Sequence, residues 1–306
     1  MPEEGPQKYI ITGASGLVGT PLVASLEADG HQVIRAVRRP VKDEARELYW
    51  DPNGTGEIEG DKFEGAHAVI HLAGENIAGK RWNDAFKKKL LDSRVKGTTL
   101  IAETVAKLNQ KPKVFACASA IGYYGERGVE QLSEEAVAAE TFLGEICVQW
   151  EACCQPARDA GVRVANMRIG VVLSPKGGAL AKMLLPFKLG GGGVLGSGEQ
   201  YMSWIDLADL VKAIRFVVDT PSLEGPVNMV APEPVTNREF TKKLGWVLSR
   251  PTILPMPGLA ARLAFGEMAE ALLLASTRVV PKRLEEAGFH FGYPDLESSL
   301  RHQLSQ

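Results

Sequence analysis

The sequence of 306 residues predicts an α/β fold built around a doubly wound parallel sheet. The first observation is an apolar run at residues 9–12 that leads into three glycines and then into the helical periodicity of residues 21–27. The second is that further short apolar runs, at residues 32–37, 68–73, 113–118 and 161–170, alternate with helical stretches. Strands joined through helices pair in parallel, because each helix carries the chain back across the sheet.

Gly13, Gly16 and Gly19 stand three residues apart in the first turn, a spacing that favours a dinucleotide site over a plain loop. Gly13 would let the chain turn sharply, Gly16 would let a pyrophosphate approach bare backbone, and Gly19 would let the helix pack against the strand. The amides and the dipole of the helix would then face the phosphates. We therefore expect the cofactor to contact the whole turn: Gly13, Ala14, Ser15, Gly16, Leu17, Val18 and Gly19.

The end of the second strand, residues 32–37, indicates which dinucleotide is favoured. Folds that bind NAD place an acid about 20 residues beyond the glycine turn, where it binds the ribose 2′-hydroxyl. Here Val37 is followed by Arg38 and Arg39. A carboxylate would repel a 2′-phosphate, whereas two guanidinium groups would hold one through charge-assisted hydrogen bonds. The sequence thus favours NADP(H), with Ser15 as a further phosphate donor; the alternative is that both arginines are solvated turn residues.

Two later strands supply further candidate residues. Residues 68–73 form the third strand, so we expect the backbone of Leu72, Ala73 and Gly74 to lie along the cofactor. His71 stands inside this apolar run and is interpreted as a core residue rather than a catalytic one. A helical region at residues 81–100 would cover one face of the sheet. The fourth strand, residues 113–118, places the loop 119–125 at the carboxyl edge, where ligands of such sheets bind.

Composition argues against several classes of protein. The chain is 45% hydrophobic and 24% charged, and its net charge of -2 gives no reason to expect nucleic acid or an anionic membrane as a partner. Charged residues interrupt the apolar stretch 259–274, which favours a buried or interfacial helix over a membrane span. The cysteines and histidines show no metal-ligand or disulfide spacing, so we expect no metal and a reducing compartment. Without a secretory signal at its start, the chain is expected in the cytoplasm, or in an organelle lumen where a transit peptide has been removed.

Several motifs together resemble those of a known family. The glycine turn, the stretch 71–74, the Gly97-Thr98 pair and the loop 119–125 resemble extended short-chain dehydrogenases/reductases of the NAD-dependent epimerase/dehydratase superfamily. More narrowly, the stretches 74–77, 119–125, 196–200, 203–205 and 278–284 are similar to those of YfcH-like epimerase-family proteins. The resemblance covers essentially the whole chain. It implies a Rossmann domain at residues 1–170, to which residues 205–228 return, and a smaller C-terminal α/β substrate domain at residues 171–204 and 229–306.

The resemblance also implies a set of catalytic residues, and this chain departs from it. Members of the superfamily use a Ser or Thr together with a Tyr-x-x-x-Lys pair, in which the tyrosine exchanges a proton with the substrate oxygen and the lysine lowers its pKa. Ser119 matches the serine, but Leu143 and Cys147 stand where the tyrosine and the lysine should be. Arg94 likewise replaces the active-site asparagine and is expected beside the cofactor.

Three interpretations of this gap remain open. In the first, the chain is an oxidoreductase or epimerase whose proton donor is displaced to Tyr123 or Tyr124, with Arg94 or Lys182 lowering its pKa, although either tyrosine could equally be a packing aromatic. In the second, the chain binds NADP(H) without turnover and acts as a regulator or scaffold, for example in cell division. In the third, Cys147 is a nucleophile, which is the least favoured because a lone cysteine on an apolar helix face is usually inert core.

The C-terminal part is expected to complete the substrate pocket. A helix at residues 180–189 precedes four glycines at 190–193, which suggest a mobile loop or lid. Gln200 and Trp204 are predicted pocket residues together with Glu75, although Trp204 could instead form domain-interface core. Helices are also expected at residues 206–216, 240–248 and 278–284, the second opened by a capping box at Thr236. The expected partner is a small molecule, carbonyl-containing or sugar-like, and the chain is expected to be a monomer or homodimer.

Overall fold

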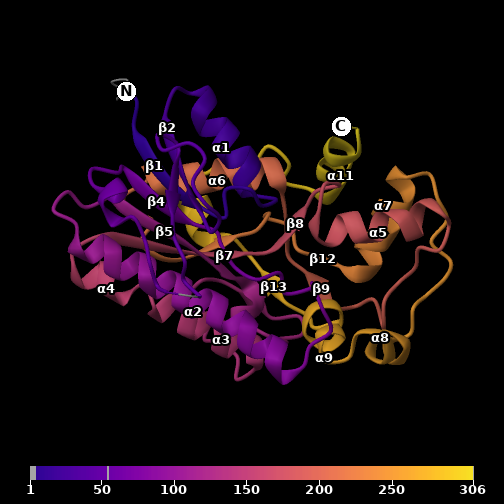
Figure 1. The fold of residues 1–306 in the computed structure, drawn as a ribbon. Coiled ribbons are helices and arrows are strands. Elements are labelled where there is room, and N and C mark those ends of the chain that lie inside the picture. The colour runs from indigo at the N-terminus through magenta and orange to yellow at the C-terminus, as the bar shows by residue number, and fades with distance from the viewer. Residues whose placement is uncertain (1–4, 54, 306) are drawn as a thin grey trace.

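The computed structural model describes residues 5–53 and 55–305 and has a central sheet of seven strands in the order β3-β2-β1-β4-β5-β7-β11 (Figure 1). All six neighbouring pairs in it are parallel. The strand order reverses between β1 and β4, so the predicted α/β fold with a doubly wound parallel sheet is confirmed. The strands are β1 (Lys8–Thr12), β2 (Gln32–Val37), β3 (Glu47–Tyr49), β4 (Ala68–His71), β5 (Val114–Ala120), β7 (Arg163–Ile169) and β11 (Gly225–Met229).

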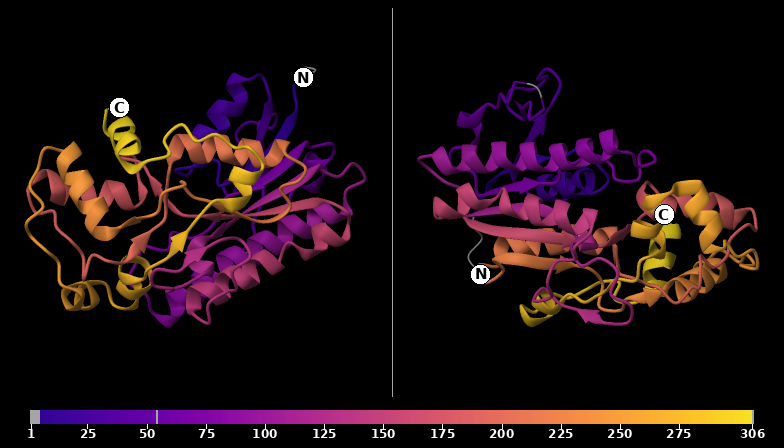
Figure 2. Two further views of the ribbon diagram at one scale, coloured as in Figure 1. Left: turned by 180° about the vertical axis from the view of Figure 1, so that it is seen from behind. Right: turned by 90° about the horizontal axis from the view of Figure 1, so that it is seen from below.

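Helices cover both faces of this sheet because the strands are apolar on both sides. One face buries residues of α1 (Gly19–Ala28), α6 (Leu207–Asp219) and α10 (Lys282–Glu286). The other buries residues of α2 (Asp84–Lys107), α3 (Phe142–Ala152) and α4 (Gln155–Asp159). Figure 2 shows α2 and α3 side by side on that second face.

A smaller C-terminal lobe stands beside the sheet and has its own core, which includes Trp204 and Phe240 (Figure 1). It holds two short strand pairs, β8 (Val171–Leu173) with β10 (Trp204–Asp206) and β9 (Tyr201–Met202) with β12 (Val235–Thr236). A further pair, β6 (Gln131–Leu132) with β13 (Arg278–Val279), links the loop after β5 to the end of the chain. The helices of the lobe are α5 (Gly178–Lys188), α7 (Asn237–Val247), α8 (Gly258–Phe265), α9 (Glu267–Ala269), the π-helix η3 (Glu270–Leu274) and α11 (Leu296–Leu304).

The chain crosses between the two lobes more often than a simple two-part division suggests. It returns from β10 to the sheet through α6 and β11. Near the C-terminus it returns again, because Leu284 and Phe289 are buried in the same cluster as α1 and α6. The large lobe is therefore completed by two segments from the second half of the chain.

Several elements differ from the sequence-based expectation. The short edge strand β3 was not anticipated, and two 3-10 turns, η1 (Gly60–Phe63) and η2 (Ile121–Tyr123), follow β3 and β5. The apolar stretch 259–274 is no single helix, because Gly266 takes a φ of 63° and separates α8 from α9, which η3 follows directly. Residues 278–279 form β13, so the helix expected over 278–284 begins at Lys282. Among the described residues, no helix combines the length and the apolar character that crossing a bilayer requires.

Candidate functional site

The glycine turn packs tightly at the carboxyl end of β1. Gly13 has a φ of 69°, and a Cβ added to it would lie 2.8 Å from the carbonyl carbon of Leu72 at the end of β4. A Cβ on Gly19 would lie 2.2 Å from the Gly13 carbonyl oxygen, so α1 packs against the turn itself rather than against the strand. Both positions exclude any side chain, so glycine is required at each.

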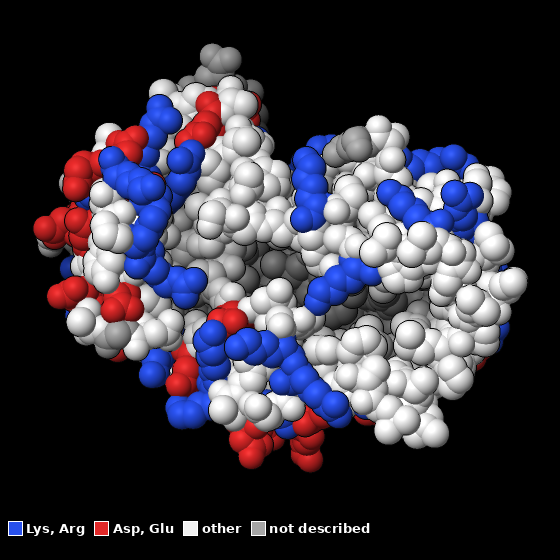
Figure 3. Space-filling view, turned by 45° about the vertical axis from the view of Figure 1, so that its right-hand side comes forward, with Lys and Arg blue, Asp and Glu red and all other residues white. Residues whose placement is uncertain are grey.

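One side of the glycine turn is exposed to solvent. Ser15 and Gly16 are exposed, and Val18, the N-cap of α1, makes no side-chain capping hydrogen bond. Gly177 of the C-terminal lobe lies close to Leu17 of the turn, since a Cβ added to Gly177 would lie 3.3 Å from Cδ1 of Leu17. Figure 3 shows a hollow between the two lobes with lysine and arginine side chains on both rims. The start of α1 and this basic rim favour an anionic ligand.

The two arginines after β2 differ in their surroundings. Arg39 forms a double ion pair with Glu47 of β3, at 2.5 Å for Nη2–Oε1 and 2.9 Å for Nη1–Oε2. This pair lowers the pKa of Glu47 to about 2 and raises the pKa of Arg39. Arg38 is exposed, and no ion pair or hydrogen bond joins it to another described residue. Of the two guanidinium groups, only that of Arg38 has no partner among the described residues. Arg38 follows β2, the parallel neighbour of the strand that leads into the glycine turn, so both lie at the same edge of the sheet.

Thr12 joins the glycine turn to the end of β4. Its Oγ1 accepts hydrogen bonds from the backbone N–H groups of Leu72 and Ala73, each at 3.2 Å, and lies 2.7 Å from Nδ1 of His71. Because the threonine oxygen already accepts twice, its own proton points to Nδ1, which leaves the imidazole proton on Nε2. Burial lowers the pKa of His71 to about 4, so the ring is neutral. His71 thus lies in the core and positions the backbone of the turn.

Arg94 of α2 lies behind the turn that follows β4. Its Nη1 donates to the carbonyl of Leu90 at 3.0 Å and its Nη2 to the carbonyl of Glu75 at 3.3 Å, while its guanidinium lies over the Trp150 ring. Burial lowers the pKa of Arg94. A Cβ added to Gly74 would lie 3.8 Å from the Arg94 Cζ. Glu75 itself turns outward and pairs with Lys89 at 2.9 Å.

Ser119 lies at the end of β5 and is almost fully buried, at 3% exposure. Its hydroxyl donates to Oε1 of Glu151 at 2.7 Å. Glu151 in turn forms a double ion pair with Arg168 of β7, at 2.8 and 2.9 Å. Because a serine hydroxyl has a single proton, Ser119 has none left to offer a substrate oxygen in this arrangement.

Both tyrosines of the following loop pack against Arg168. Tyr124 is fully buried; its hydroxyl donates to Oδ1 of Asn228 at 2.7 Å and accepts from Nη1 of Arg168 at 3.0 Å. Burial raises the pKa of Tyr124 to about 12. The Tyr123 ring packs against the guanidinium of Arg168, whose Cζ lies 3.5 Å from the centre of the ring. Both rings lie near the Arg168 guanidinium, which favours the alternative in which the two tyrosines are packing aromatics.

Two further residues of α3, Leu143 and Cys147, lie at the end of β5. A Cβ added to Gly122 would lie 3.2 Å from Cβ of Leu143, and Sγ of Cys147 lies 3.6 Å from the carbonyl of Ala120. These contacts put Leu143 and Cys147 at the end of β5, where the family resemblance implies the tyrosine and the lysine. Burial raises the pKa of Cys147 to about 11, so the thiol stays protonated and is a poor nucleophile.

Gln200 and Trp204, the two C-terminal residues expected in a pocket, both make hydrogen bonds within the protein. Trp204 is fully buried in the core of the smaller lobe, where its Nε1 donates to the carbonyl of Glu233 at 3.0 Å. Gln200 donates to the carbonyls of Leu195 and Leu273, which ties the glycine-rich loop to η3. Lys182 donates to the carbonyl of Ala78 across the cleft at 2.9 Å. The apolar surroundings of Trp204 favour the alternative in which it is core.

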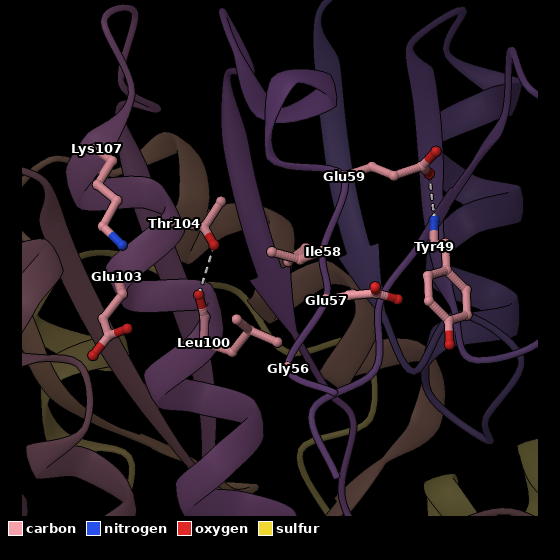
Figure 4. A pocket seen from close by; sticks show the side chains of 9 residues that line it. All are labelled: Tyr49, Gly56, Glu57, Ile58, Glu59, Leu100, Glu103, Thr104 and Lys107. Atoms are coloured by element: carbon pink, nitrogen blue, oxygen red, sulfur yellow. Dashed lines mark hydrogen bonds between the residues drawn. The ribbon is translucent and has the colours of Figure 1, made fainter. Parts of the chain in front are cut away.

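Two cavities lie near the sheet. One of about 550 Å³ opens between the end of β3, the loop 56–59 and the second half of α2, and Figure 4 shows Thr104 and Lys107 on its helical side with Tyr49 opposite. None of the predicted site residues lines it. The other, the α3–α9 pocket, has a volume of about 300 Å³ and lies between the loop after β5, the start of α3 and the helices α9 and η3. Its lining is Trp82, Gly122, Gly125, Glu126, Thr141, Phe142, Leu143, Glu267, Glu270, Ala271, Leu274, Ala275 and Thr277.

Sequence reasoning missed the buried Glu151–Arg168 pair and most of this pocket. One signal was present, since Arg168 is a charge inside a strand that is otherwise apolar, and such a charge requires a partner. The partner could not be identified, because Glu151 lies on α3 and only the fold brings it to β7. The described residues include no cluster of histidine, cysteine, aspartate and glutamate that could hold a metal.

Comparisons with known proteins agree with this geometry. A family model described as the NAD dependent epimerase/dehydratase family matches residues 9–230, and a domain of unknown function matches residues 256–303. Epimerase family protein Mb2239 of Mycobacterium bovis is 45% identical over 291 residues, which cover 95% of each chain. A crystal structure of the human epimerase family protein SDR39U1 with NADPH is 32% identical, covers 98% of this chain and 99% of that one, and has a TM-score of 0.89. A UDP-N-acetylglucosamine 4-epimerase from Bacillus cereus, at 16% identity and a TM-score of 0.76, covers 97% of this chain and 98% of its own and shares the fold.

Proposed function

The chain belongs to the NAD-dependent epimerase/dehydratase family, and from this premise we propose that it binds NADP(H) and acts as an oxidoreductase or epimerase-like enzyme on a small carbonyl or sugar-like molecule. The single observation that carries the proposal is Arg38, an exposed guanidinium without a partner among the described residues, at the sheet edge where the glycine turn follows the neighbouring strand β1. The NADPH named for the human relative supports the same choice of cofactor.

Each cofactor group has a matching set of residues in this chain. The pyrophosphate would lie on the turn 13–19 at the start of α1, and the 2′-phosphate would pair with Arg38. The backbone of Leu72, Ala73 and Gly74 would run along the ribose and nicotinamide, held by Thr12 and backed by Arg94. The bound nicotinamide supplies hydride transfer. The chain supplies the orientation of the ring.

A second candidate function is favoured by the side chains at the end of β5. The protons of Ser119 and Tyr124 are engaged in internal hydrogen bonds, and Leu143 has no proton to give. A protein with these side chains could bind NADP(H) as a regulator or scaffold without turnover, for example in cell division. Both candidates require the same cofactor site, and only turnover distinguishes them.

The cofactor assignment is tested by titration with NADPH and NADH, using Arg38→Ala and, as the matched control, Arg39→Ala. We expect Arg38→Ala to weaken NADPH binding by about tenfold or more and to leave NADH binding unchanged, because only NADPH carries the 2′-phosphate. Arg39→Ala should weaken NADPH binding less, since its guanidinium is held by Glu47. Equal affinity for the two cofactors, unchanged by Arg38→Ala, would overturn the assignment.

Turnover is then tested by following NADPH oxidation with a panel of small carbonyl compounds. Oxidation that depends on the added carbonyl supports the enzyme. Tight NADPH binding without oxidation by any of them supports the regulator.

The four cysteines are free thiols, so we also propose that the protein works in a reducing compartment such as the cytoplasm. For its assembly we propose a monomer or a homodimer.

A further inference from the structure

The α3–α9 pocket lies where a substrate of this fold is expected. Leu143 forms part of its wall and packs against Gly122, directly beyond the carboxyl end of β5. The opposite wall comes from α9 and η3 of the C-terminal lobe. In η3 the N–H of Ala275 donates to the carbonyl of Glu270 at 2.9 Å, the wide turn of a π-helix, which often marks a functional site.

We propose that this pocket binds the substrate and that the substrate is a small, mainly apolar molecule without a phosphate group. The proposal deepens the proposed function and rests on it for the chemistry that follows binding.

The volume limits what can enter. At about 300 Å³ the pocket is at the small end of the range of about 300–1,000 Å³ that is usual for small-molecule sites. A nucleoside diphosphate sugar has a base, two sugars and two phosphates, which far exceed such a space. A single ring with a short side chain fits it.

The side chains that line the pocket also favour an apolar molecule without a phosphate group. Trp82, Phe142, Leu143 and Leu274 make the pocket mainly apolar, and its described lining includes three glutamates but no lysine or arginine. Near the pocket, Lys87 pairs with Glu267 at 2.5 Å and Arg262 pairs with Glu270, while Arg81 lies against Gly266 outside the described lining. A diphosphate needs positive charge or clustered amide donors, and the described lining has no cationic side chain to supply that charge.

One hydroxyl in the lining can orient a carbonyl group. Thr141 is the N-cap of α3, and its Oγ1 accepts the N–H of Gly144 at 3.2 Å, which leaves its own proton as a donor. The other threonine, Thr277, donates its proton to the carbonyl of Gly125 at 3.0 Å. A small ketone could therefore place its oxygen at Thr141 and its apolar body against Leu143 and Phe142.

The test measures binding of benzylacetone and of UDP-glucose to the NADPH-loaded protein by calorimetry. Ala271→Phe fills the pocket, and Ala264→Phe adds the same ring to an exposed position on α8 outside it. We expect benzylacetone to bind the wild type and Ala264→Phe alike, and to bind Ala271→Phe at least about tenfold more weakly. UDP-glucose should show no saturable binding.

Several results would overturn the proposal: saturable UDP-glucose binding that Ala271→Phe abolishes, no binding of benzylacetone, or equal benzylacetone binding by the two phenylalanine variants. If Ala271→Phe does not fold, Ala275→Leu narrows the pocket from a neighbouring position. NADPH affinity is measured in the same samples. A wild-type protein that does not bind NADPH would refute the cofactor proposal. The pocket proposal would still be tested, because benzylacetone binding is also measured without cofactor.

Discussion

Ser119 and Glu151 are joined by a hydrogen bond of 2.7 Å that connects the end of β5 to the buried guanidinium of Arg168. Ser119, which was expected to face a substrate, is one end of an internal polar chain, Ser119–Glu151–Arg168–Tyr124–Asn228. Only 4% of the Arg168 side chain is exposed, so this chain supplies the charge compensation that the interior requires.

Glu151→Gln should destabilise the fold by about 3 kcal/mol or more, because it leaves the Arg168 guanidinium buried without a counter-charge. Ser119→Ala should cost only about 1 kcal/mol, since Glu151 keeps its ion pair. Urea denaturation monitored by circular dichroism gives both values. Similar losses for the two variants would show that the ion pair is not the dominant contribution.

Gly13→Ala should lower both stability and NADPH affinity. Gly13 has a φ of 69° and no room for a Cβ beside Leu72, so the alanine must displace the turn that the phosphates would contact. Gly30→Ala is the matched control, because Gly30 has a φ of 81° and nothing within 4 Å of an added Cβ. The control should lose about 1–2 kcal/mol from its backbone conformation and keep its NADPH affinity. Equal NADPH affinity in the two variants would contradict the role of Gly13.

His71→Leu should make stability less dependent on pH. Burial lowers the pKa of His71 from 6.5 to about 4, so the unfolded chain binds a proton between these values that the folded chain does not. The stability due to neutral His71 is complete above pH 6.5 and is lost, by about 3 kcal/mol, as pH falls toward 4.

Urea denaturation at steps from about pH 7 to about pH 4.5 should therefore show a steeper loss for the wild type than for His71→Leu. The Glu47 carboxylate does not interfere in this window. Its ion pair with Arg39 lowers its pKa from 4.5 to about 2, so its contribution is lost only as pH falls below 4.5. If the free energy of unfolding fell equally with pH in the two proteins, His71 would be taking up its proton in the folded state as readily as in the unfolded chain.

Much of the fold could be predicted because it follows from local patterns. Six of the seven strands of the sheet lie within or beside apolar runs of the sequence, and the capping box at Thr236 begins α7 as expected. The edge strand β3 escaped prediction because it has three residues and pairs on one side only. The break at Gly266 escaped because its apolar neighbours continue the helical pattern through it.

The candidate site could be predicted less completely, because its chemistry depends on pairings between distant segments. The two adjacent arginines look equivalent in the sequence. In the structure Glu47, eight residues beyond Arg39, forms an ion pair with Arg39 and none with Arg38. Trp204 and Tyr124 have polar tips that suit a pocket or a core equally well. Their burial was decided by partners 29 and 104 residues away in the sequence.

Tyr124→Phe tests whether the displaced proton donor is this tyrosine. Removal of the hydroxyl leaves Oδ1 of Asn228 without its donor and Nη1 of Arg168 without one acceptor, so we expect a loss of about 1–3 kcal/mol in stability. NADPH affinity and any NADPH oxidation should be unchanged, because the hydroxyl is fully buried and its pKa is raised to about 12. Tyr123→Phe is the matched control: it keeps the ring against Arg168, and no hydrogen bond to a described residue is lost, so its stability should match the wild type. A folded Tyr124→Phe variant that binds NADPH but has lost oxidation would instead make Tyr124 the proton donor and would require the loop 121–125 to open during turnover.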